Sequence, residues 1–354
     1  MNLIKNWDHI QNRYDEFWAR ENHDRPLMFV TAKKDGADYS KMPIQPEKVA
    51  DRWLDFPNVI ARNRVHIENT YYAGESFPYY MPNLGPDILG AILGCDITFG
   101  ENTSWAGHVV EDWDAYKIPA MDNNNKWYRL ITELTDLAVE DAKGDFLVGV
   151  TDIHAGADAL VSLRGPQELC LDLYDCPEKI MDLPIKIWDT GRAFYLDQYD
   201  RTTKGTVGPV TWLPGYHRKK WYVTSCDFIC MISPEVLEEF IIPELMLETR
   251  FFDANIFHLD GPGALKHLDR LLKIPTINGV QWVNGDGAPP PSKWKDVLVK
   301  IQRAGKNLHL SVSPDELPVL AEYLEPEGVL LNVGCGCQAE ADAVVKMAAD
   351  LWKK

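Results

Sequence analysis

The sequence lacks a long apolar run, an excess of basic residues and an even set of cysteines. No segment approaches the ~20 apolar residues of a membrane span, and the N-terminus has no apolar signal core. The 36 basic residues against 53 acidic ones give a net charge of −17. This charge argues against nucleic acid or an anionic membrane surface as partner, because both need a basic patch. Seven scattered cysteines favour reduced thiols and a cytoplasmic location.

Motifs for phosphate binding and serine hydrolysis are also missing. No Walker motif, GxGxxG or GxSxG occurs in the chain. Phosphate-loop chemistry and Ser-His-Asp hydrolysis therefore have no support in the sequence. A small-molecule substrate and a partner protein are the remaining options.

What the chain does contain is an alternation of short apolar runs with longer amphipathic segments. The runs predict eight strands, at Leu27–Thr31, Ile97–Phe99, Phe146–Val150, Thr206–Trp212, Ile256–Leu259, Gly279–Val283, Leu308–Val312 and Val329–Val333. The segments predict helices at Lys126–Lys143, Pro177–Tyr199, Pro234–Asp253, Ser292–Ala304, Pro314–Tyr323 and Gln338–Trp352.

This alternation predicts parallel strands joined by right-handed crossovers. Eight units would close a single (β/α)8 TIM barrel, and a doubly wound sheet is the alternative. We expect one domain over residues 1–354. Residues 1–80 would be an irregular N-terminal elaboration covering a barrel of residues 81–354.

Residues that can bind a metal follow two of the predicted strands. His258 and Asp260 are two residues apart, so their side chains share one face of a strand. Cys335 ends another strand, with Cys337 as an alternative thiolate. Nitrogen, oxygen and sulfur ligands with a fourth position open are typical of a catalytic zinc. The competing interpretation is a capped strand end with a core histidine.

Other strand ends supply further candidates for chemistry. Asp152 and His154 form an acid/base couple or the polar start of a loop, and Asp227 is a third candidate for proton transfer. Side chains placed to contact a substrate are Glu101, Trp212, Tyr222, Trp282 and Asn284.

Several segments resemble the uroporphyrinogen decarboxylase superfamily, and within it the cobalamin-dependent methyltransferase branch. They are the runs 224–235, 242–245, 258–261 and 331–336, with Gly165-Pro166 and 175–178 similar to the middle section. The resemblance covers residues 145–350 and implies a single (β/α)8 barrel.

The resemblance also implies a zinc site of a His-x-Cys pair and a distant Cys. His258 matches the first ligand and Cys335 the last, whereas Asp260 stands where the middle Cys is expected. The decarboxylase branch carries an Arg-Gln-Ala-Gly-Arg run, and the equivalent stretch, residues 25–36, lacks both of its arginines. Uroporphyrinogen decarboxylation is therefore disfavoured.

We expect a zinc-dependent methyltransferase that moves a methyl group between a small substrate and cobalt. The substrate would be a methoxy compound or a thiol, and the cobalt would belong to a corrinoid protein or a free cobamide (cobalamin). One alternative is a metal-free decarboxylase or lyase that uses Asp152, His154 and Asp227. Another is a non-enzymatic barrel that binds a ligand.

Overall fold

The computed structural model describes residue 4, residues 6–204 and residues 209–353. Its strands are β1 (Leu27–Lys33), β2 (Thr70–Gly74), β3 (Tyr79–Tyr80), β4 (Asp96–Phe99), β5 (Ser104–Gly107), β6 (Leu147–Val148), β7 (Trp221–Ser225), β8 (Ala254–Asp260), β9 (Gly279–Val283), β10 (Asn307–Val312) and β11 (Val329–Cys335).

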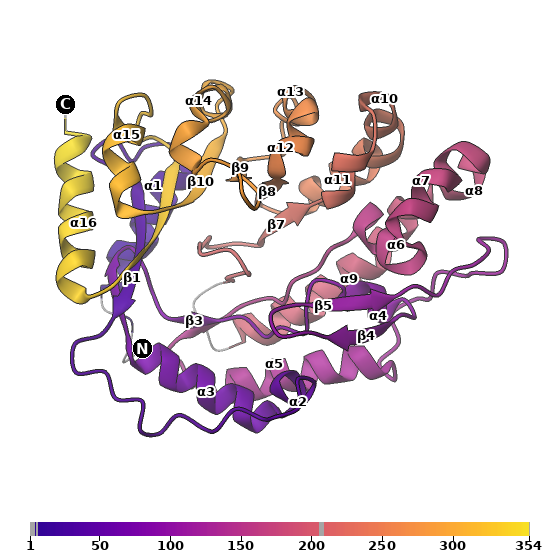
Figure 1. Ribbon diagram of the computed structural model, residues 1–354, viewed down its shortest axis with the longest axis horizontal. Coiled ribbons are helices and arrows are strands. Elements are labelled where there is room, and N and C mark those ends of the chain that lie inside the picture. The colour runs from indigo at the N-terminus through magenta and orange to yellow at the C-terminus, as the bar shows by residue number, and fades with distance from the viewer. Residues whose placement is uncertain (1–3, 5, 205–208, 354) are drawn as a thin grey trace.

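Helices connect and cover these strands (Figure 1). The α-helices are α1 (Trp7–Ala19), α2 (Asp51–Leu54), α3 (Phe56–Glu68), α4 (Ile88–Ile92), α5 (Lys126–Ala142), α6 (Gly156–Arg164), α7 (Pro166–Asp175), α8 (Pro177–Ile180), α9 (Leu183–Thr203), α10 (Pro234–Val236), α11 (Ile242–Phe251), α12 (Gly261–Ala264), α13 (Leu268–Leu271), α14 (Lys295–Arg303), α15 (Leu317–Ala321) and α16 (Gln338–Leu351). Short 3-10 or π turns are η1 (Asp227–Met231), η2 (Leu237–Ile241), η3 (Leu265–His267), η4 (Pro291–Lys293) and η5 (Pro314–Glu316).

A seven-stranded sheet in the order β2-β1-β11-β10-β9-β8-β7 forms the centre of the molecule. All neighbours pair in parallel except β1 and β2, which are antiparallel. The expected mixture of parallel strands and helical crossovers is therefore confirmed for β1 and for β7 to β11. Crossover helices such as α11, between β7 and β8, and α14, between β9 and β10, allow these strands to run parallel, because a parallel neighbour needs a long return path.

Three of the predicted strands do not join this sheet. Phe146–Val150 contains β6, which pairs with β3 in a separate two-stranded sheet. Ile97–Phe99 falls in β4, which pairs only with β5 in a separate antiparallel hairpin of the described chain. Of Thr206–Trp212, residues 206–208 lie outside the described residues and 209–212 are not in a strand. The position is taken by β7, whose five residues are all buried and rich in β-branched and aromatic side chains.

The first 80 residues are not irregular, in contrast to the prediction. They contain α1 and α3, and β1 lies between β2 and β11 within the central sheet. The antiparallel pairing of β2 with β1, which ends at Gly74 with a φ of +62°, was not predicted from the sequence. Residues 1–80 therefore contribute two strands, β1 and β2, to the central sheet.

The sheet is not closed into a ring by continuous pairing. Single backbone hydrogen bonds extend the β1–β2 and β3–β6 pairs by one step each, and among the described residues they do not join the two edges of the sheet, β2 and β7. The Glu75 amide donates to the Met28 carbonyl (2.8 Å), and the Val150 amide donates to the Val210 carbonyl (2.9 Å). The central strands thus form an open sheet, with β1 on one side of the molecule and β10, β9, β8 and β7 following across it (Figure 1).

The two faces of the central sheet pack into different cores. One core, here called the inner core, contains Leu27, Phe29, Val223, Ile256 and Leu330 from β1, β7, β8 and β11. The alternate residues of the same strands pack against the surrounding helices in the outer core, which includes side chains of α11, α14, α15 and α16. Alternation along each strand therefore decides which side chains reach the space inside the sheet.

No helix within the described residues is both long enough and apolar enough to cross a membrane.

Candidate functional site

The ends of β7 and β8 bring Asp227, His258 and Asp260 together. One ligand atom from each lies within 4.8 Å of the other two. The strands explain this arrangement: Ser225 pairs in register with His258, and Asp227 and Asp260 each follow by two residues. All three side chains therefore leave the inner face of the sheet at adjacent strand ends.

The orientation of the His258 ring is fixed by a neighbouring strand. Its Nδ1 lies 2.7 Å from Oε1 of Gln281, the residue in register with it on β9. Because a carboxamide oxygen only accepts, Nδ1 carries the hydrogen and Nε2 keeps its lone pair. Nε2 faces Oδ1 of Asp227 at 4.0 Å. Hydrogen bonds of this kind orient histidine ligands in metal sites.

The two carboxylates remain available to a ligand. Within the described residues, neither Asp227 nor Asp260 accepts a hydrogen bond through its side chain. Partial burial and the nearby Asp158 raise the pKa of Asp227, while His154 and His258 act in the opposite direction. A divalent cation would remove this repulsion, because it binds the ionised carboxylate. His258, Asp227 and Asp260 therefore fit a metal.

A second group, His154, Asp158 and Asp227, satisfies the same distance criterion but is already engaged. Nε2 of His154 lies 3.3 Å from Asp152, and Nδ1 lies 3.4 Å from Asp158. Burial opposes the charge on His154, but these carboxylates outweigh it and raise its pKa well above the ordinary value. A protonated imidazole cannot bind a metal. Asp152 and His154 thus form an ion pair beside the site.

Cys335 is not brought together with His258 and Asp260. It belongs to β11, three strands away from β8, which corresponds to roughly 14 Å of sheet. It pairs with Ala32 and has the same parity as Val333, so it packs on the outer core, whereas His258 lies on the inner face. Cys337 is exposed at the start of α16. Neither cysteine belongs to a metal-binding group among the described residues.

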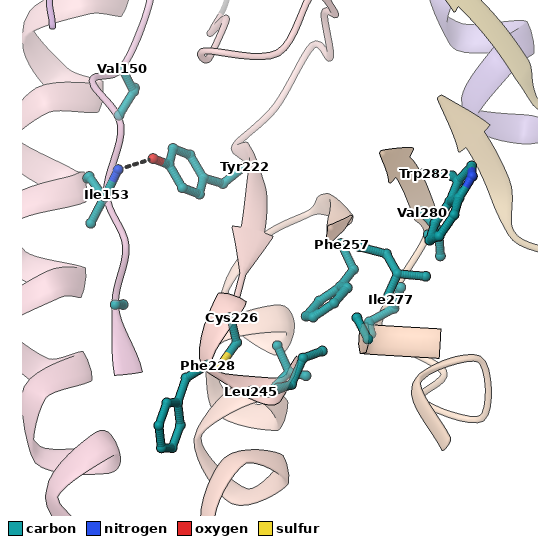
Figure 2. Close-up of a cluster of buried hydrophobic side chains, with 14 of the residues drawn as sticks. Val150, Ile153, Tyr222, Cys226, Phe228, Leu245, Phe257, Ile277, Val280 and Trp282 are labelled. Atoms are coloured by element: carbon teal, nitrogen blue, oxygen red, sulfur yellow. Dashed lines mark hydrogen bonds between the residues drawn. The ribbon is translucent and has the colours of Figure 1, made fainter. Parts of the chain in front are cut away.

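Three of the five predicted substrate contacts lie elsewhere. Tyr222 is buried on the outer core, where its hydroxyl donates to the Thr151 carbonyl and accepts from the Ile153 amide (Figure 2). Trp282 is also buried there and packs against Trp294. Asn284 donates only weakly, at 3.4 Å, within its own turn. Tyr222 and Trp282 were misplaced because each is one residue out of phase with the inner face.

Trp212 and Glu101 do line a cavity, of about 500 Å³, near His258. The edge of the Trp212 ring lies against His258, with ring centroids 5.2 Å apart. Glu101 is exposed and forms an ion pair with Arg52 at the rim. Trp53, Tyr79 and Tyr80 supply further aromatic wall, and the polar side chains of Gln45, Asn63 and Asn83 line the rest of it, which suits a flat molecule that also carries polar groups.

A smaller cavity of about 280 Å³ lies on the Asp227 side of the site. Its polar lining is Asp87, His154, Asp158 and Asp227. Its apolar lining is Pro86, Val161, Pro166, Phe228 and Met231. Asp158 was not identified from the sequence, although Gly156-Ala157-Asp158 directly follows the Asp152–His154 pair.

Comparisons with known proteins identify a shared fold. No family model and no curated protein matches the sequence. Among solved structures, a methyltransferase from Methanosarcina mazei aligns with a TM-score of 0.57 at 15% sequence identity. The alignment covers 96% of this chain and 98% of that one, so the similarity extends over the whole architecture.

Proposed function

We propose that the protein is a zinc-dependent methyltransferase that transfers a methyl group between a small substrate and the cobalt of a corrinoid protein or free cobamide. The observation that carries the proposal is the convergence of Asp227, His258 and Asp260 at the ends of adjacent strands. The similarity in fold to a methyltransferase supports it. We further propose that the open sheet, completed by β3 and β6, corresponds to a distorted (β/α)8 barrel.

The proposed ligand set is His258 Nε2 and one oxygen each from Asp227 and Asp260. Zinc bound there would supply a Lewis acid with an open position for the reacting heteroatom. Gln281 keeps the His258 lone pair directed at that position. The side chain of Asp227 is 53% exposed, which leaves the site accessible from the smaller cavity.

The donor atoms favour an oxygen substrate over a thiol. Two carboxylates and one imidazole are harder ligands than the thiolates that the resemblance implied. A hard site stabilises the developing charge on an oxygen leaving group better than it binds sulfur. We therefore place a methoxy compound in the cavity lined by Trp212, where an aromatic ring would find aromatic walls.

Metal analysis of the purified protein tests the proposal. We expect about one zinc per chain in the wild type and loss of zinc in His258→Gln and Asp227→Asn. Cys335→Ser is the matched control, because its thiol lies on the outer face and its removal should leave the metal in place. Absence of zinc in the reconstituted wild type, or its loss only in Cys335→Ser, would contradict the ligand set.

A second candidate function rests on the Asp152–His154–Asp158 arrangement. A protonated His154 borders the cavity that also contains Asp227. These groups could exchange a proton with a substrate in a metal-free decarboxylase or lyase. Turnover of a carboxylated compound by metal-free protein, abolished in His154→Gln, would support this function over methyl transfer.

A further inference from the structure

The segment that carries Asp227 is held by a carboxylate from another element. Asp227 starts the 3-10 turn η1, whose first amides have no partner within the turn. The residue before it, Cys226, makes no side-chain cap. Instead, the two oxygens of Asp158 on α6 accept hydrogen bonds from the amides of Asp227 (3.0 Å) and Phe228 (3.1 Å).

Asp158 is itself fixed from several sides. It is buried in the first turn of α6, and His154 lies 3.4 Å from its Oδ2. Burial opposes ionisation of Asp158, but His154 and the two amides outweigh it and lower its pKa. Both oxygens of Asp158 thus accept hydrogen bonds from the backbone at the start of η1.

We infer that Asp158 is a positioning residue for the metal site. It orients the Asp227 carboxylate by accepting hydrogen bonds from the backbone amides of Asp227 and Phe228. The side chain of Asp227 is half exposed and, within the described chain, has no hydrogen bond of its own. Its direction is therefore set by the backbone of η1. The buried ring of Phe228 and the two Asp158 bonds hold that backbone.

This role explains why an acidic residue is buried behind the ligand without binding the metal. A carboxylate accepts two amides at once, whereas a carboxamide accepts one and presents an NH₂ group to the other. Asp158→Asn therefore keeps the volume of the side chain but can accept only one of the two hydrogen bonds from the amides of Asp227 and Phe228. Changes in groups that orient metal ligands weaken metal binding by ~10–100-fold.

The inference rests on the proposed function, and the test separates the two. Zinc affinity would be measured by competition with a chromophoric chelator for the wild type, Asp227→Asn, Asp158→Asn and Asp172→Asn, together with the visible spectrum of each Co²⁺-substituted protein. Asp172, on α7, is a matched control. It is similarly buried but accepts hydrogen bonds from Arg164, at the end of α6, and from Trp113, and it belongs to neither metal-capable group of the described residues.

We expect Asp158→Asn to bind zinc ~10–100-fold more weakly with an altered Co²⁺ spectrum, and Asp172→Asn to keep both at wild-type values. Unchanged zinc affinity and spectrum in Asp158→Asn, with binding lost in Asp227→Asn, would overturn this inference alone. No zinc in the wild type would overturn it together with the proposed function.

His154→Gln provides a second variant should Asp158→Asn fold poorly. It removes the ion pair to Asp158 but leaves the two amide bonds, so a smaller loss of zinc affinity is expected. Complete loss in His154→Gln with retention in His258→Gln would show that the metal binds to the other group and would overturn the positioning role.

Discussion

Replacing Glu248 by Gln should make the stability of the protein less dependent on pH. Glu244 and Glu248 lie one turn apart on α11, and both are buried. Burial, with a contribution from Asp158, raises the pKa of Glu248 to about 8 from 4.5, although His154 acts against this. Glu248 is therefore neutral in the folded protein at pH 7 and ionised in the unfolded chain.

The sign of the effect follows from this difference. A carboxyl group with a raised folded pKa contributes stability that is fully present below pH 4.5 and is lost as pH rises toward 8. The loss is about 1.4 kcal/mol per pH unit within that window. Between pH 5.5 and 7.0 the wild type should therefore lose about 2 kcal/mol through this group, and Glu248→Gln should not.

Urea unfolding monitored by far-UV circular dichroism at several pH values measures the difference. The free energy of unfolding of Glu248→Gln, relative to the wild type, should rise by about 2 kcal/mol from pH 5.5 to 7.0. Glu239→Gln, at an exposed position of the preceding η2 turn, is the control and should parallel the wild type. If the free energy of unfolding of Glu248→Gln changed with pH in parallel with that of the wild type, Glu248 would not be uncharged in the folded state.

Three further substitutions test the surroundings of the site. Gly156→Ala should destabilise the fold by about 1–3 kcal/mol in thermal unfolding, because φ is +58° and the new Cβ would lie 2.6 Å from Glu244 Oε2; wild-type stability would contradict this packing. Tyr222→Phe should cost about 1–3 kcal/mol, since it strands the buried Ile153 amide and Thr151 carbonyl; an unchanged urea midpoint would refute that hydrogen-bond role. Gln281→Leu should weaken zinc binding by ~10–100-fold without changing the fold, as seen by circular dichroism, because His258 loses its orienting acceptor; full affinity would show that Gln281 does not select the tautomer.

The mixed α/β class could be predicted because its signals are local, whereas closure into a barrel is a property of the whole sheet. Strand β9 was predicted with its observed bounds, Gly279–Val283, since a short apolar run is flanked by residues that break a strand. The prediction of a strand at residues 206–212, where the sheet instead uses β7, had a different cause. Both segments contain aromatic and β-branched residues, and only the pairing of Trp221–Ser225 with β8 distinguishes them.

Within the candidate site, the proximity of His258 and Asp260 could be predicted because strand parity can be read within one segment. His258 and Asp260 share a face because they are two residues apart in one strand. Whether a residue of a different strand faces the same side depends on the register between strands, which the sequence does not state. Cys335 therefore looked equivalent to His258 at a strand end, although its neighbours Val333 and Leu331 pack toward the helices.

Correct placement of β7 changes the chemistry expected of the site. With Trp221–Ser225 as the strand beside β8, Asp227 reaches the inner face two residues after the register partner of His258. The thiolate implied by the resemblance is then replaced by a second carboxylate from a neighbouring strand. A site with one imidazole and two carboxylates carries the same charge of about −2 as the imidazole, carboxylate and thiolate predicted from the sequence, but its ligands are harder, so under the proposed function it would favour a hard divalent cation. Under the proposed ligand set these two carboxylates would repel each other before a cation binds, and the hydrogen bonds that Asp158 accepts from η1 would then have their largest effect on the direction of Asp227.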